Sequence, residues 1–207
     1  WWVDQSQVLS PEASYLLLTF GSATHFANSF ESDGSYSAQL PADAKKQWLE
    51  FASEAVNIIK INHSAQLSSK PTMPHLLIIC AIRTITSLST IAITEIHEML
   101  LNSNVVPALL WTSENDLEFG GWSLSAYAAA AAANLIGRNE EGLTLTRGAV
   151  SSVLSNWLQY FDPSSRRRSY PAHKVATETA AVANISISDA NKAFIVEHAG
   201  VMEALAM

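Results

Sequence analysis

Cysteine, glycine and proline are scarce in this chain of 207 residues, which contains 1, 8 and 7 of them. The single thiol, Cys80, cannot form an internal disulfide, and its apolar surroundings in HLLIICAIRTITSL predict a small buried side chain. We therefore expect a reducing compartment, cytoplasmic or nuclear. Because helix breakers are few and long segments are rich in Ala, Leu, Ile and Ser, helices joined by short loops are favoured over a sheet.

Charged residues are also infrequent, at 15% against 48% apolar residues, and this balance excludes a disordered chain. The net charge of −7 argues against nucleic-acid binding, which needs a basic face to displace counterions from phosphates. A protein partner with a basic surface fits this charge better.

Patterns that carry catalysis are missing as well. The sequence has no zinc-ligand spacing, phosphate-binding glycine loop or nucleophile elbow, and the HEML phrase at His97 lacks the second histidine of a metalloprotease helix. The six histidines fall on different expected elements, where ordinary surface or helix-end roles are favoured over ligation or acid–base chemistry. We expect a non-enzyme without cofactor or metal.

One phrase recurs three times along the chain. Its copies align at turn positions that are glycine, or asparagine as the usual substitute, at intervals of 44 and 52 residues. Helical units with a period of about 40 residues are typical of two- or three-helix repeats, and one insertion, DPSSRRRSYPA, explains the longer interval. The copies are AITEIHEMLLNSNVVPALLW (92–111, turn at Asn104), NEEGLTLTRGAVSSVLSNWL (139–158, turn at Gly148) and DANKAFIVEHAGVMEALAM (189–207, turn at Gly200).

The copies place the expected helices from Pro74 onward in a fixed order. Each unit has a long helix, a short helix, and a further helix after the turn. The long helices are expected at 75–90, 117–136 and 173–186, the short ones at 94–102, 140–146 and 190–198, and the further ones from Val105, Ala149 and Val201. Before Pro74 we expect a helix that starts at Ser10 and Pro11, an amphipathic helix over 43–61, and a loop over 63–74.

Two of the long helices carry similar phrases, A-A-A-A-N-L-I (130–136) and A-A-V-A-N-I-S (180–186). Together with the recurring phrase, they make the chain similar to the armadillo repeat family, whose third helices carry W-A-L-x-N-L/I. The resemblance implies a right-handed α-solenoid. It also implies that Asn134 and Asn184 lie on the concave surface and hold the backbone of an extended peptide, since an amide both donates and accepts hydrogen bonds.

The sequence also departs from the family. Ala130 and Ala180 stand where nuclear-import adaptors carry tryptophan, so the aromatic walls for a lysine side chain are missing. In the first unit Ser87 stands at the asparagine position and Arg83 four residues before it. We assign 74–207 to armadillo-like repeats, the last one truncated, and 1–73 to N-terminal helices that form a degenerate repeat or a capping element.

Two further stretches have a functional and a structural interpretation. Arg166, Arg167 and Arg168, followed by Ser169, form an acidic-partner contact or a regulatory phosphorylation site, or else a solvated loop. The nearly uncharged stretch 75–94 is long enough for a membrane span, but the arginine at its middle and its Ser and Thr residues favour a buried solenoid helix.

We therefore expect a protein–protein interaction segment of a larger protein, continuing into further repeats beyond residue 207, that binds an extended peptide or a partner subunit on its concave face. The binding residues predicted are Asn134, Asn184, Ser87 and Arg83. The alternative is a structural helical subunit embedded in a large assembly, membrane-associated or not. A peptide-binding solenoid is expected to be soluble once capped, whereas an obligate subunit is expected to aggregate without its neighbours.

Overall fold

A computed structural model describes residues 42–67, 75–90, 94–115, 118–119, 122–136, 144–162 and 172–206. Over these residues the protein is all-α, apart from β1 (Glu118–Phe119), which pairs antiparallel with β2 (Trp122–Ser123). The predicted all-α class is therefore confirmed. The helices are α2 (Ala42–Leu67), α3 (His75–Leu88), α4 (Thr94–Asn102), α5 (Val106–Glu114), α6 (Leu124–Ile136), α7 (Arg147–Leu158), α8 (Ala172–Ile185), α9 (Asp189–Glu197) and α10 (Val201–Leu205).

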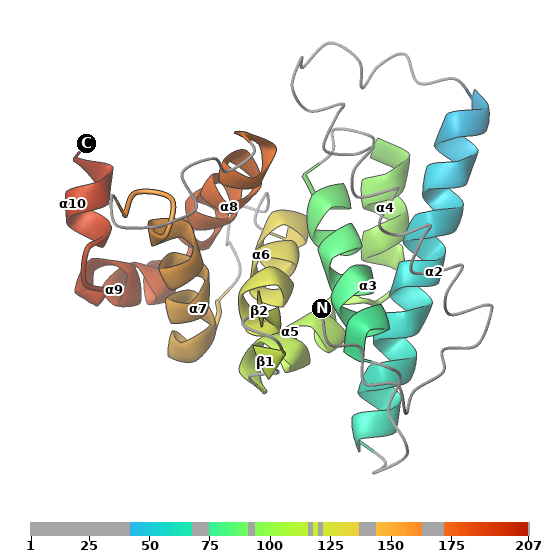
Figure 1. Ribbon diagram of the computed structural model, residues 1–207, viewed down its shortest axis with the longest axis horizontal. Helices are drawn as coiled ribbons and strands as arrows, with labels where there is room; N and C mark the ends of the chain where they lie inside the picture. The colour runs from blue at the N-terminus through green and yellow to red at the C-terminus, as the bar shows by residue number, and fades with distance from the viewer. Residues whose placement is uncertain are drawn as a thin grey trace.

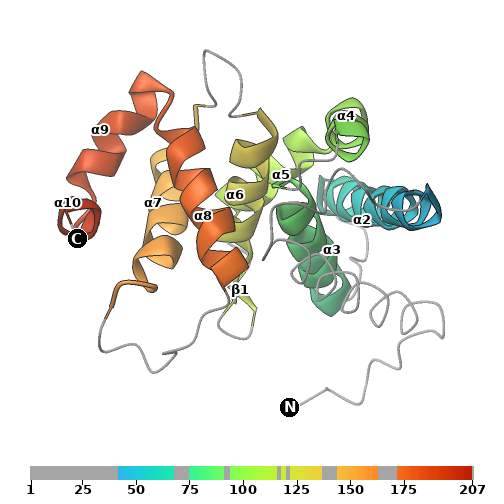
Figure 2. The same cartoon turned by 90° about the horizontal axis from the view of Figure 1, so that it is seen from above.

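The helices follow one another across the molecule, from α2 at one end to α9 and α10 at the other (Figure 1). Seen from above, α6 lies between α3 and α8 (Figure 2), and it packs against both. The three long helices that carry the predicted binding residues are therefore neighbours, although they lie far apart in the sequence.

The first hydrophobic core is shared by α2, α3, α4, α5 and α6. In α2, Trp48, Ala52, Val56 and Ile59 are buried and recur at steps of three or four residues, so they share one helix face. Lys60 Nζ donates to the Ser103 carbonyl oxygen at 3.0 Å, which ties α2 to the turn between α4 and α5. The helix ends at Leu67, so the prediction of a loop from residue 63 is wrong for residues 63–67, which are helical.

The second core joins α6 to α7, α8, α9 and α10, and the alanine run of α6 serves both cores. Ala128, Ala131 and Ala132 face the first core, whereas Ala129, Ala130 and Ala133 face the second. Small side chains let helices approach closely on both sides, which explains why α6 is buried almost all round. The other helices contribute larger side chains to the second core, among them Val150 and Trp157 of α7, Ile185 of α8, Ile195 of α9 and Val201 of α10.

Most helix positions agree with the expected order. The short helix α4 has the expected bounds, α10 begins at Val201, and α5 begins one residue after Val105. Besides the loop expected from residue 63 and the turn expected at Gly148, two expectations are wrong. The helix expected from 117 begins at Leu124 because β1 and β2 precede it, and 144–146, expected as the end of a short helix, are not helical.

Turn residues before α5 and α10 adopt left-handed angles, with φ of 57° at Asn104 and 85° at Gly200. Glycine takes these angles freely and asparagine tolerates them better than most residues. Gly148, expected at an equivalent turn, instead lies inside α7. The reason is that the Thr146 side chain caps the helix by accepting from the Ala149 amide at 3.3 Å, so α7 starts before the glycine.

Candidate functional site

The two asparagines predicted for peptide binding meet at the joint between α6 and α8. Asn184 Nδ2 donates to Asn134 Oδ1 at 2.9 Å. Asn134 is buried, with 2% of its surface exposed, whereas Asn184 is half-buried. Asn134 therefore positions the amide of Asn184, and Asn184 is the member of the pair that solvent reaches.

A related hydrogen bond recurs at both joints of the three long helices. Asn134 Nδ2 donates to the Thr177 carbonyl oxygen across the α6–α8 joint at 3.4 Å. At the α3–α6 joint, the Thr86 hydroxyl donates to two carbonyl oxygens. One belongs to Ile82 in the same helix, at 2.8 Å, and the other belongs to Tyr127 on α6, at 3.0 Å. Both interhelical acceptors, Tyr127 and Thr177, lie seven residues before the aligned asparagines. At both joints, the later helix therefore offers the carbonyl oxygen of the equivalent residue to the helix before it.

The other predicted binding residues lie on α3. Arg83 is half-buried, and its guanidinium carbon is 6.0 Å from the centre of the Tyr127 ring on α6, a cation–π distance. Burial raises the pKa of the Cys80 thiol, and the nearby Arg83 charge partly offsets this rise. Ser87, one turn after Arg83, is half-buried, and its carbonyl oxygen accepts from the Thr90 hydroxyl at 2.9 Å.

Asn191 is a buried polar residue that the sequence patterns did not indicate. Its side chain has 0% exposure, its Oδ1 accepts from the Leu145 amide at 3.0 Å, and its Nδ2 donates to the Ile185 carbonyl oxygen at 2.9 Å. One amide thus links α9 to the end of α8 and to the segment before α7. Nothing local distinguishes this asparagine from an ordinary residue in a first helical turn.

Side chains of α7 and α8 also form polar contacts at the edge of the second core. Asn156 Nδ2 donates to Glu178 Oε1 at 2.7 Å, and Trp157 Nε1 donates to Thr179 Oγ1 at 3.1 Å. Glu178 is 4% exposed. Because buried polar groups are costly unless they are hydrogen-bonded, these contacts fix how α8 lies on α7.

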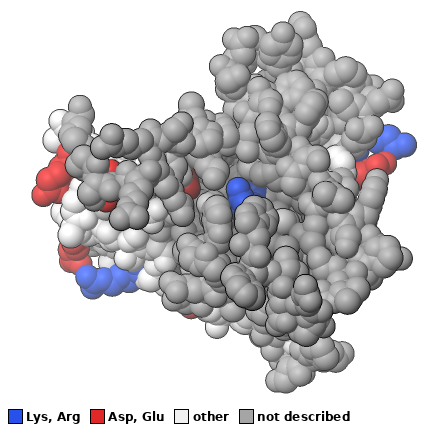
Figure 3. Space-filling view, viewed as in Figure 1, with Lys and Arg blue, Asp and Glu red and all other residues white. Residues whose placement is uncertain are grey.

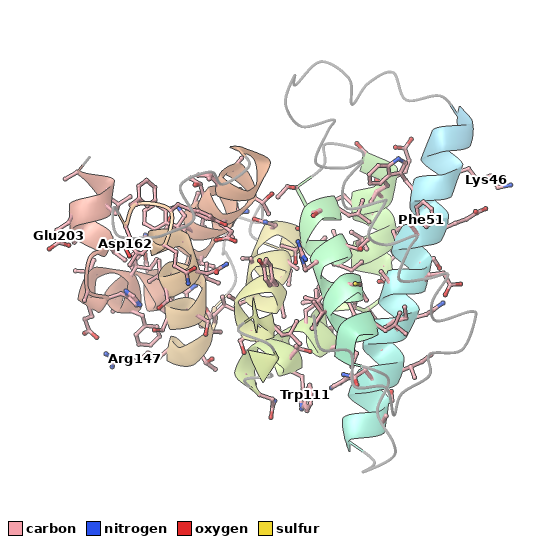
Figure 4. The ribbon with its side chains drawn as sticks, in the orientation of Figure 1. Lys46, Phe51, Trp111, Arg147, Asp162 and Glu203 are labelled. Carbon is pink, nitrogen blue, oxygen red and sulfur yellow. The ribbon has the colours of Figure 1, made fainter. Side chains whose placement is uncertain are left out.

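Charge gathers unevenly over the described surface. Acidic atoms are prominent at the end formed by α9 and α10 (Figure 3), and Glu203 points outward there (Figure 4). Arg147 Nη2 lies 3.0 Å from Glu197 Oε2, with both side chains well exposed. Lys192 donates to Asp189 at 2.6 Å, and this hydrogen bond, together with the ammonium charge, lowers the pKa of the Asp189 carboxyl.

The arginine loop, Arg166 to Arg168 with Ser169, lies outside the described residues. Among the residues that the structure does describe, no group of three or more His, Cys, Asp or Glu side chains is placed to hold a metal ion. Of the described helices, none has the length and apolar character needed to cross a membrane, and α3 ends at Leu88 inside the stretch considered for a span.

Comparisons with known proteins add no assignment to this geometry: the chain matches no family model, no curated protein and no solved structure.

Proposed function

We propose that this chain is a segment of an armadillo-like α-solenoid and that it binds an extended peptide or a partner subunit on the face that α3, α6 and α8 share. The observation that carries the proposal is the hydrogen bond between Asn184 and Asn134. It joins the aligned asparagines of two neighbouring long helices, as stacked helical repeats would. The related bonds that end at Tyr127 and Thr177 support the same stacking.

Asn184 has the free groups that a peptide backbone requires. Its Nδ2 uses one of two protons on Asn134, and its Oδ1 makes no hydrogen bond within the described part of the chain. The Oδ1 atom is therefore available to a peptide N–H, and the second Nδ2 proton to a peptide carbonyl. The Asn134 side chain is buried, so in this proposal it does not contact the peptide itself. Its role is to position the Asn184 amide through their hydrogen bond.

Further along the same face, Arg83 and Ser87 extend the surface over α3. Arg83, whose guanidinium carbon lies 6.0 Å from the centre of the Tyr127 ring, supplies positive charge to an acidic side chain of the ligand, and Ser87 is half-buried one turn further along α3. The helix α2 packs on α3, α4 and α5 and shares their core, which fits a capping element at the start of the solenoid. An intracellular location goes with this proposal.

The test is selection of peptides from a random display library on the immobilised full chain, followed by affinity measurement with purified peptides. Asn184→Ala is expected to weaken binding of the selected peptides about two- to twelvefold, because losing one backbone-binding amide costs about 0.5–1.5 kcal/mol. Asn57→Ala, at an exposed asparagine of α2, is the matched control and should leave affinity unchanged. Failure to select any peptide, or equal affinity for both variants, would overturn the proposal.

A further inference from the structure

Charge on the three long helices differs in sign from the charge of the whole chain. Their sequences contain one arginine, one lysine and one glutamate, namely Arg83 in α3 and Lys174 and Glu178 in α8. Glu178 is 4% exposed and its Oε1 accepts from Asn156 Nδ2 at 2.7 Å, so this carboxylate is committed to the contact with α7. Arg83 is half-buried and keeps part of its surface open to solvent. The described side chains therefore give this face positive charge, although the net charge of the chain is −7.

Arg83 is positioned by its neighbour on α6. Its guanidinium carbon lies 6.0 Å from the centre of the Tyr127 ring, and the Tyr127 carbonyl oxygen accepts from the Thr86 hydroxyl at 3.0 Å. The same residue of α6 thus contacts α3 through its ring and through its backbone. A guanidinium packed near an aromatic ring keeps the donors along its edge, and its rigid fork loses little freedom when it binds a carboxylate. Arg83 is therefore suited to an aspartate or glutamate side chain.

Arg83 and Asn184 contact α6 at two points that are seven residues apart, at Tyr127 and at Asn134. Seven residues of an α-helix span about 10 Å along its axis. Because α6 lies between α3 and α8 (Figure 2), the distance across the helices adds to this span. An extended chain advances about 3.3 Å per residue and covers such a distance in about three to five residues.

Alanines lie between these two points. Ala130 stands on α6 between Tyr127 and Asn134, at steps of three and four residues, and Ala180 stands one turn before Asn184 on α8. Ala130 is 3% exposed and Ala180 is half-buried. A methyl group cannot enclose a ligand side chain, so selectivity along this stretch is concentrated at its two ends.

We propose that the ligand of this face is an extended acidic peptide, in which an aspartate or glutamate binds Arg83 about three to five residues from the residue whose backbone binds Asn184. The inference rests on the proposed function and adds the charge of the ligand and the spacing of its two anchors. It replaces, for this face, the basic partner that the net charge of the chain favours.

The test begins with a peptide selected on the full chain. Each of its backbone amides is N-methylated in turn, and the methylation whose cost disappears in Asn184→Ala marks the residue bound by Asn184. Each aspartate or glutamate is then replaced by asparagine or glutamine. The replacement whose cost disappears in Arg83→Gln marks the residue bound by Arg83, as in a double-mutant cycle. Fluorescence anisotropy measures every affinity.

We expect Arg83→Gln to weaken the selected peptide at least about threefold. The two marked residues should lie about three to five positions apart. Arg147→Gln, which removes an exposed arginine from α7, is the matched control and should bind as wild type. Arg83→Glu should prefer a peptide with lysine at the marked acidic position, a reversal that a merely misfolded variant would not show.

Two results would overturn this inference and leave the proposed function standing. One is a peptide that Asn184→Ala weakens and that binds equally well to Arg83→Gln and wild type. The other is a marked acidic residue outside the expected spacing. If no peptide is selected, or if Asn184→Ala leaves every affinity unchanged, the inference and the proposed function fail together.

Discussion

Replacing Asn191 with leucine tests the joint between α8 and α9 most sharply. The substitution keeps the branched shape and the number of heavy atoms of the side chain, and it removes the hydrogen bonds of the buried amide to Leu145 and Ile185. The Leu145 N–H and the Ile185 carbonyl then lose partners in a region closed to water, and each unsatisfied group costs about 1–3 kcal/mol. The extra apolar burial of leucine offsets about 1–2 kcal/mol of this loss.

The net expectation is a loss of about 1–4 kcal/mol in the free energy of unfolding. For a chain of this length, that corresponds to a fall in Tm of about 2–16 °C. Thermal unfolding followed by tryptophan fluorescence measures it, and hydrogen exchange at the Leu145 amide should accelerate in the variant. Asn57→Leu, at an exposed site of α2, should change stability by about 0.5 kcal/mol or less. If the two variants were equally stable, Asn191 would not hold the joint as its contacts indicate.

Three further outcomes follow from the turns and from the thiol. Gly200→Ala should lower stability by about 1 kcal/mol, because φ is 85° and the nearest atom to an added Cβ, Leu158 Cδ1 at 3.7 Å, leaves backbone strain as the cost. Gly148→Ala should raise stability by about 0.5–1 kcal/mol, because this glycine is helical and has nothing within 4 Å of an added Cβ. Urea unfolding measures the stability of both glycine variants. A Gly200→Ala variant more stable than Gly148→Ala would contradict the assignment of the turn to Gly200. Cys80 should react with iodoacetamide more slowly in the native protein than in the unfolded one near pH 8, because burial raises its pKa more than Arg83 lowers it. Since the folded state disfavours the thiolate, this group makes stability fall as pH rises past the pKa of the unfolded thiol, and equal labelling rates would contradict the burial.

The order of the helices could be predicted because its signals are local. Apolar residues at steps of three and four, a turn asparagine at 104 and a turn glycine at 200 lie within the segments they shape. These signals place α4, α5 and α10 within one residue of the structure at their starts.

The errors arose where a second local signal was stronger. Gly120 and Gly121 stand between two short runs that pair as β1 and β2, and a glycine pair at that spacing is a hairpin signal that outweighs the helical pattern extended back to 117. At the start of α7, the capping threonine Thr146 decides the boundary and leaves Gly148 inside the helix.

The candidate site was only partly predictable, since it depends on how far apart helices lie. Sequence alignment identified Asn134 and Asn184 as equivalent, but their direct hydrogen bond and the burial of Asn134 follow from the close packing of α6 on α8. The alanine run makes that close approach possible. Asn191 escaped prediction for the same reason, because its contacts depend on how α9 packs beside the end of α8 and the segment before α7.

The most direct test of the central claim follows the side-chain amide signals of the full chain by NMR while a library-selected peptide is added. The Asn184 signals are identified by their loss in Asn184→Ala. We expect these signals to shift with the same affinity as peptide binding, together with backbone signals of α3, α6 and α8. Saturable binding that leaves the Asn184 signals unchanged and shifts only signals from α2 or α10 would contradict it.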